Sequence, residues 1–147
     1  MLPIKFKKIC PDSKTPTRAY ENAACWDLYT TESAYIKPGE GKFVYVGISL
    51  EIPVNWMGII YTRSGHGIKH NLRNHLGIID SDYRGDISPY VFNHGKTPYK
   101  FNIGDKCAQI FFQPVFKVDL VEAFALNNTK RGSKGFGSSD KDNKKGK

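Results

Sequence analysis

The sequence has no apolar run that approaches the roughly 18 residues needed for a helix to span a bilayer. Its first residues also lack the charged-then-apolar order of a signal peptide. The three cysteines, Cys10, Cys25 and Cys107, are widely spaced and form no CxxC pair, so neither a disulfide framework nor a zinc site is expected. His66 and His70 have metal-like spacing, but the glycine between them interrupts a shared helix face, so we expect core or surface histidines. We therefore expect an intracellular, cytoplasmic protein that binds no membrane.

Sustained helical periodicity is also absent, and no internal repeat is visible. Short runs rich in β-branched and aromatic residues instead alternate with turns rich in Gly, Pro and Asp, at intervals of about 8–12 residues. This pattern is typical of all-β sandwiches, jelly rolls and barrels. We expect strands at residues 43–52, 57–61, 87–92 and 107–115, and a short helix capped by Ser64.

Acidic residues are outnumbered, since 22 Lys and Arg face 14 Asp and Glu and give a net charge of +8. Residues 127–147 hold seven of these cations and two of the acids, so this segment alone carries +5. Phe136 is its only large apolar residue, and such a composition cannot form a core. We predict a jelly-roll-like core at residues 1–126 and a mobile arm at residues 127–147. The charge predicts attraction to phosphate but does not distinguish nucleic acid, lipid and free nucleotide.

The stretch at residues 76–86 has the form strand, turn, strand. An apolar run leads to Asp80 and Asp82, and Tyr83 and Arg84 follow in the same turn before a glycine closes it. A carboxylate in such a turn can act on a water molecule or a metal ion. The simpler alternative is a solvated hairpin tip, and the local sequence leaves both open.

Two segments could bind phosphate. Arg63-Ser64-Gly65 offers a guanidinium, a hydroxyl and free backbone N–H groups, although an ordinary Ser-capped turn has the same residues. Residues 131–139 hold two cations, three hydroxyls and three glycines but match neither a Walker A loop nor a dinucleotide-binding turn, and a flexible linker is the alternative. The aromatic Phe136 in this polar segment favours a partner such as a base. Asp27 follows apolar residues, and a buried acid must be paired or functional.

Together these pieces resemble the five ordered motifs of the trimeric deoxyuridine triphosphatase (dUTPase) family. The resemblance covers residues 24–139, and the third motif is the most specific of the five. The sequence departs from the family pattern at Cys25, Lys134 and Asp140, where the family has glycine. In order, the motifs are residues 24–28 (Ala-Cys-Trp-Asp-Leu), 63–65 (Arg-Ser-Gly), 77–85 (Gly-Ile-Ile-Asp-Ser-Asp-Tyr-Arg-Gly), 104–109 (Gly-Asp-Lys-Cys-Ala-Gln) and 131–139 (Arg-Gly-Ser-Lys-Gly-Phe-Gly-Ser-Ser).

The resemblance implies an all-β jelly-roll subunit in a homotrimer with shared active sites, and hydrolysis of dUTP to dUMP and pyrophosphate. Such an activity limits uracil incorporation into DNA and supplies dUMP for dTTP synthesis. By the same resemblance, Asp80 activates the water that attacks the α-phosphorus. Asp27 holds Mg²⁺, the implied cofactor, through a water molecule.

The resemblance also assigns the substrate contacts. The second and fourth motifs bind phosphates, Tyr83 leaves no room for a 2′-hydroxyl, and the hairpin around Asn74 and Gly77 reads uracil. The fifth motif closes over the nucleotide, with Phe136 stacked on uracil. The expected contacts are Arg63, Ser64, Gly65, Asn74, Gly77, Tyr83, Gln109, Arg131, Phe136, Gly137, Ser138 and Ser139.

Three other functions are compatible with parts of the sequence. A deoxycytidine triphosphate deaminase shares the expected fold, but the third motif has no glutamate to run the deamination. A catalytically idle homologue would act as a binding or regulatory protein. Against idleness stand four intact residues, Asp27, Asp80, Gln109 and Phe136, which leave a second binding role open. Only the basic arm suggests a nucleic-acid-binding protein, so we expect no specific nucleic-acid binding.

Overall fold

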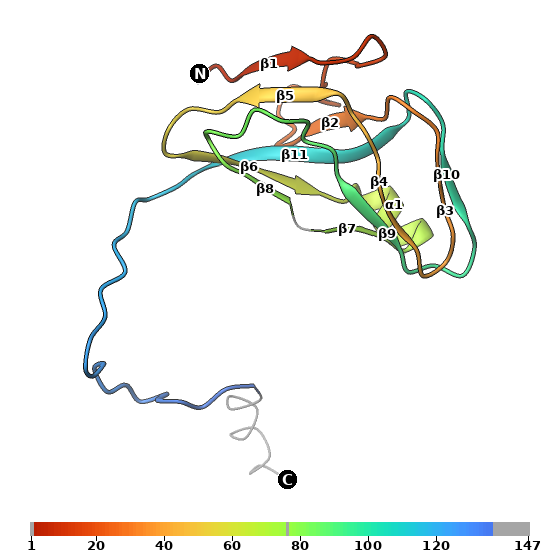
Figure 1. Cartoon of the computed structure of the whole chain (residues 1–147). Helices are drawn as coiled ribbons and strands as arrows, with labels where there is room; N and C mark the ends of the chain where they lie inside the picture. Colours follow the sequence, from red (N-terminus) through yellow and green to blue (C-terminus); the bar gives the residue numbers. More distant parts are fainter. Residues whose placement is uncertain (1, 76, 137–147) are drawn as a thin grey trace. The chain divides into compact units, whose positions relative to one another are not determined.

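The structure is a computed structural model, which describes residues 2–75 and 77–136 (Figure 1). Its contacts divide the chain into two units, Met1–Lys117 and Val118–Lys147. The described residues form eleven short strands and a single helix, all within the first unit. That helix, α1 (Ser64–His70), is neither long enough nor apolar enough to cross a membrane.

Antiparallel pairing joins the strands of the first unit into four sheets. The strands are β1 (Lys5–Lys8), β2 (Trp26–Tyr29), β3 (Ala34–Ile36), β4 (Gly41–Phe43), β5 (Ile48–Glu51), β6 (Trp56–Tyr61), β7 (Leu72–Asn74), β8 (Gly77–Ile79), β9 (Tyr90–Asn93), β10 (Tyr99–Phe101) and β11 (Lys106–Pro114). The largest sheet has the order β2-β11-β6-β8, and the smaller sheets are β1-β5, β10-β3 and β4-β9-β7. All four contribute apolar residues to one core, which confirms the predicted all-β, jelly-roll-like fold.

In the two central strands of the four-stranded sheet, β6 and β11, side chains point alternately toward the core and toward the outward side. In β6, Ile60 is 2% exposed, whereas the next residue, Tyr61, is 47% exposed. In β11, Ile110 is likewise buried while Phe111 lies half-buried on the other side. β11 runs between β2 and β6, which explains the apolar density of its sequence (Figure 1). The outward side of this sheet carries the candidate site.

The structure differs from the sequence prediction at two strands. The strand expected at residues 43–52 is divided into β4 and β5, because Gly47 between them has a positive φ of 63° and turns the chain. The strand expected at residues 87–92 is wrong in its first half, since β9 begins only at Tyr90. Pro89 precedes β9 and has no N–H group to continue a ladder.

In the second unit, every described residue from 118 to 136 is exposed, and none lies in a strand or helix. This exposed stretch includes the apolar residues Val118, Leu120 and Phe124, which composition had assigned to the core segment. The prediction that residues 127–147 form a mobile arm, separate from a core at residues 1–126, stays a prediction.

Candidate functional site

The chain passes from β6 into α1 at the tripeptide Arg63-Ser64-Gly65. Arg63 occupies the N-cap position in an extended conformation, with φ −69° and ψ 141°, and no side chain caps the helix. The prediction that Ser64 caps the helix is therefore wrong by one residue, because Ser64 is already the first helical residue. Its hydroxyl is consequently not used as a helix cap and lies at the wall of a pocket.

Asp27 lies on the outward side of β2, in register with Gln109 of β11, which is itself in register with Tyr61 of β6. Only 7% of Asp27 is exposed, so its charge must be paired. The structure supplies two partners: Arg63 Nε donates to Oδ1 at 2.8 Å, and Lys106 Nζ forms an ion pair with Oδ2 at 2.7 Å. Each carboxylate oxygen thus has a cationic partner.

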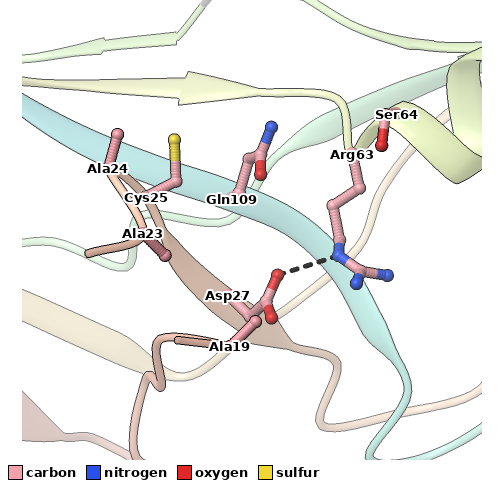
Figure 2. A pocket seen from close by; sticks show the side chains of 8 residues that line it. All are labelled: Ala19, Ala23, Ala24, Cys25, Asp27, Arg63, Ser64 and Gln109. Atoms are coloured by element: carbon pink, nitrogen blue, oxygen red, sulfur yellow. Dashed lines mark hydrogen bonds and ion pairs between the residues drawn. The ribbon is translucent and has the colours of Figure 1, made fainter. Parts of the chain in front are cut away.

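A cavity of about 230 Å³ opens beside this ion pair (Figure 2). Gln109 reaches it from β11, and its Nε2 donates to the Thr62 carbonyl at 3.2 Å. Figure 2 shows Arg63 turned so that Nε meets Asp27 while both terminal nitrogens point away from it. The pocket therefore brings together side chains of the first, second and fourth motifs. Its lining residues are Ala19, Ala23, Ala24, Cys25, Asp27, Arg63, Ser64 and Gln109.

Cys25 stands in this pocket at the position where the family pattern has glycine. Burial raises the pKa of its thiol, and the negative charge of Asp27 raises it further. The group is therefore a neutral thiol at neutral pH and a poor nucleophile. Because the Cys25 thiol is small and uncharged, the positive charge at the pocket wall comes from Arg63.

The turn that carries Asp80 lies elsewhere on the same sheet. β8 pairs with β6 so that Ile79 faces Gly58, which places Asp80 one position further along, at the level of Met57. The row that contains Asp27 crosses β6 at Tyr61, four residues away, which corresponds to about 13 Å along the strand. Asp80 is exposed and does not line the pocket.

Tyr83 lies with Asp80 in this turn, and it too is outside the pocket. Its hydroxyl donates to the Asp86 carbonyl at 3.1 Å, and Arg84 Nη1 donates to the Ser81 carbonyl at 2.7 Å. The turn is thus held by its own hydrogen bonds, with the Asp80 carboxylate and the Tyr83 ring exposed on its surface.

Asn74, at the end of β7, has a buried side-chain amide whose two polar atoms, Oδ1 and Nδ2, find no partner among the described residues. Its backbone N–H is satisfied by Thr62 Oγ1 at 2.6 Å. An unpaired buried amide costs roughly 1–3 kcal/mol. Gly77, at the start of β8, is half-buried.

The arm residues belong to the second unit. Arg131 Nε donates to the Lys134 carbonyl at 3.1 Å, and Phe136 is exposed. Three predicted substrate contacts, Gly137, Ser138 and Ser139, lie outside the described residues, as does Asp140. Closure of this segment over a nucleotide stays a prediction.

A resident metal centre does not fit the described residues. They contain no group of three or more His, Cys, Asp and Glu side chains placed to hold an ion. Asp27, which the resemblance assigned to Mg²⁺, already has a cation on each oxygen. A divalent ion at this carboxylate would compete with two positive charges.

Sequence reasoning assigned no role to Lys106, although it stands in the fourth motif. Its contact with Asp27 depends on the register between β2 and β11, which shifts between Lys106 and Ala108. A cross-strand contact over this separation leaves no local signal in the sequence.

His66 of α1 is a half-buried histidine in an aromatic cluster, with its ring centroid 5.7 Å from that of Tyr99 and 5.3 Å from that of Phe101. Burial lowers its pKa, and the charges of Arg63 and His70 lower it further. Because the unfolded chain then takes up a proton first, the stability of the fold falls as the pH drops below about 6.5.

We expect His66→Phe to reduce the fall in melting temperature between pH 7 and pH 5, because the variant keeps the aromatic packing and removes the titrating group. Thermal melts across this range measure it. His94→Phe, at an exposed histidine, is the matched control and keeps the wild-type slope. If His66→Phe leaves the change of melting temperature with pH as it is in the wild type, His66 does not control the loss of stability at acid pH.

The fold and the pocket define an all-β protein with an arginine-lined pocket at one end of its largest sheet. The family model for dUTPase matches residues 12–140, and the chain belongs to the dUTPase family. This confirms the family predicted from the five motifs.

Relatives named deoxyuridine 5′-triphosphate nucleotidohydrolase match along most of the chain. The protein of Nocardia farcinica is 41% identical over 140 residues, which are 93% of this chain and 85% of that protein. The protein of Clostridium tetani is 38% identical over 140 residues, 94% of this chain and 97% of that protein. The protein of Vaccinia virus strain Copenhagen is 38% identical over 136 residues, 92% of each chain.

Solved structures share the fold. A point mutant of the Staphylococcus bacteriophage 80alpha dUTPase with dUpNHpp has a TM-score of 0.88 at 21% identity, and the match covers 95% of this chain and 99% of that one. A point mutant of the dUTPase from phage phi11 of S. aureus, which coordinates a structural Mg(II) ion, has a TM-score of 0.80 at 21% identity over 84% of this chain and 98% of that one.

Proposed function

We propose that this protein hydrolyses dUTP to dUMP and pyrophosphate. The observation that carries the proposal is the pocket in which Arg63, Ser64 and Gln109 converge with two Arg63 nitrogens turned away from their ion pair. Membership of the dUTPase family and the names of the relatives support the same substrate. We place the protein in the cytoplasm. There, this reaction limits uracil in DNA and supplies dUMP for dTTP synthesis.

In the proposed mechanism Asp80 accepts a proton from a water molecule, whose oxygen forms a bond to the α-phosphorus. The bond from that phosphorus to the bridging oxygen breaks, and pyrophosphate leaves with the electron pair. Arg63, Ser64 and Gln109 hold the phosphate oxygens in line. Mg²⁺ would be bound by the triphosphate of the substrate, where it would offset part of the negative charge.

Two features support selectivity for deoxyuridine. The unpaired amide of Asn74 can give a donor and an acceptor to the uracil edge, and Gly77 keeps the adjacent hairpin backbone accessible. The exposed Tyr83 ring, whose hydroxyl is tied to the Asp86 carbonyl, offers a surface against the sugar that excludes a 2′-hydroxyl. In this proposal the arm closes the site through Arg131, Phe136, Gly137, Ser138 and Ser139.

Pyrophosphate release from dUTP, with dCTP, dTTP and UTP alongside, tests this function. Release from dUTP alone is expected. Release of ammonia from dCTP would instead identify the deaminase that shares the fold. No product from any of the four nucleotides would contradict the proposal that the protein is an enzyme.

We further propose that the active protein is a homotrimer whose sites are shared between chains. The register of the sheet supports this, because Asp80 and the pocket lie at opposite ends of β6 within one chain. Between them runs an outward apolar row of Phe111, Ile59 and Ile78, and Ile78 is 55% exposed. Copies packed over this row can place the Asp80 of one chain at the pocket of another, and such head-to-tail contacts close into a ring.

Mixing two inactive variants tests the shared site. We expect Asp80→Asn and Arg63→Ala, refolded together in equal amounts, to recover roughly a quarter of wild-type turnover, because random assembly pairs an intact turn with an intact pocket in one site of four. Steady-state pyrophosphate release measures the recovery.

The matched control mixes Arg63→Ala with Gln109→Ala. Both changes lie in the pocket of one chain, so every site keeps a defect and no activity returns. Recovery in neither mixture, with all variants folded and assembled, would place Asp80 and Arg63 of one chain in the same site.

A further inference from the structure

We propose that Lys106 is a positioning residue: by holding one oxygen of Asp27, it prevents that carboxylate from engaging the terminal nitrogens of Arg63 and so keeps them free for the substrate phosphates. The inference rests on the proposed function and adds a residue to it. It also gives Asp27 a different role from the Mg²⁺ contact implied by the resemblance.

The ion pair between Arg63 and Asp27 is made through a single nitrogen of the arginine. Arg63 contacts Asp27 through Nε alone, at 2.8 Å to Oδ1, and its terminal nitrogens point away (Figure 2). An arginine beside a carboxylate commonly binds both oxygens through two parallel N–H groups. Here the second oxygen, Oδ2, is taken by Lys106 Nζ at 2.7 Å. A carboxylate oxygen can accept from more than one donor, so Lys106 acts by orientation: it holds Oδ2 against its own ammonium and away from the terminal nitrogens of Arg63.

The surroundings hold this arrangement in place. The backbone of Asp27 is tied to Thr17, whose carbonyl accepts its N–H at 2.7 Å. The Lys106 ammonium lies 5.9 Å from the ring centroid of Tyr29, and the Tyr29 hydroxyl pairs with Thr17 Oγ1 at 2.6 Å. These contacts hold the Asp27 backbone and the Lys106 ammonium in place, so the direction of the Asp27 carboxylate depends on its two ion pairs.

The net charge of Arg63, Lys106 and Asp27 affects how strongly the site attracts phosphates. Two cations and one carboxylate leave a net charge of +1 facing a triphosphate. The hydrogen bond from Lys106 to Asp27 raises the pKa of Lys106, so this amine stays charged throughout the neutral range. Without Lys106, Asp27 can rotate onto the Arg63 fork and compete with the phosphates for it.

The test is the dissociation constant of dUpNHpp, measured by titration calorimetry on the full chain with and without Mg²⁺. Lys106→Met is expected to weaken binding on the order of tenfold, the scale of one charge-assisted hydrogen bond. Lys106→Arg restores a cation on Asp27 and is expected to bind like the wild type. Thermal melts show that each variant is folded.

The matched control is Lys14→Met. Lys14 Nζ lies 5.6 Å from the same Tyr29 ring but donates to the Gly104 carbonyl instead of Asp27. Its removal takes away the same charge in the same neighbourhood and is expected to leave the dissociation constant within about twofold, as for an exposed charge screened by solvent. An equal loss in Lys14→Met and Lys106→Met would reduce Lys106 to a general charge effect and overturn the proposal.

A double-mutant cycle separates an action through Asp27 from a direct phosphate contact. In an Asp27→Asn background no carboxylate can compete for Arg63, so adding Lys106→Met is expected to cost little. A full tenfold loss in that background would overturn the proposal. If the wild type binds dUpNHpp and Lys106→Met binds it equally well, only the inference about Lys106 is wrong. If the wild type neither binds dUpNHpp nor cleaves dUTP, the proposed function is wrong as well.

Discussion

Asp80→Asn is expected to bind dUpNHpp like the wild type and to turn over dUTP about 10²-fold or more slowly, the low end of what a positioned base contributes. The substitution keeps the size of the side chain and removes its ability to take a proton. Because Asp80 is exposed in a turn held by its own hydrogen bonds, the change leaves the fold intact. Burst and steady-state pyrophosphate release, with calorimetric binding of dUpNHpp, separate chemistry from affinity.

Asp82→Asn is the matched control, since Asp82 lies two residues away in the same exposed turn and loses the same charge. We expect its turnover within about threefold of the wild type, the scale of an exposed charge. Similar losses in both variants would assign the effect to the charge of the turn, and full turnover in Asp80→Asn would remove Asp80 as the base.

Local patterns predicted the fold because strand alternation and turn residues act over a few positions. β6 and β11 lie close to where alternation placed them, and α1 begins beside Ser64. The failures lie at two positions where a single residue interrupts an otherwise alternating pattern. Pro89 delays the start of β9, and Gly47, turned to positive φ, splits one predicted strand into β4 and β5.

The motifs predicted which residues gather in the pocket but not how they are partnered. Arg63, Ser64 and Gln109 come together as expected, whereas Asp80 and Tyr83 lie outside the pocket. Strand order and register decide this separation, and neither can be read from residue spacing. The same holds for Lys106, which reaches Asp27 only through the pairing of β11 with β2.

Removal of residues 131–147 is expected to leave a folded, assembled protein whose dUTP turnover falls on the order of 10²-fold, the scale of losing one preorganised charge contact. The core belongs to the first unit, Met1–Lys117, so the melting temperature should not change. In the proposed function the arm supplies Arg131 to the phosphates and Phe136 to the base, and its closure would exclude water from the reacting phosphate. Turnover, thermal melts and sedimentation measure the three quantities.

Removal of residues 141–147 alone is the matched control, because it takes away four of the seven arm cations and keeps the whole fifth motif. If the arm acts as a lid, this shorter deletion keeps nearly full turnover, since general attraction by exposed cations is screened by salt. If the arm acts only by its charge, both deletions lower turnover in proportion to the cations lost, and added salt erases the difference. Full activity in the chain that ends at residue 130 would show that the reaction needs no fifth motif, and the pocket and the Asp80 turn would then have to exclude water by themselves.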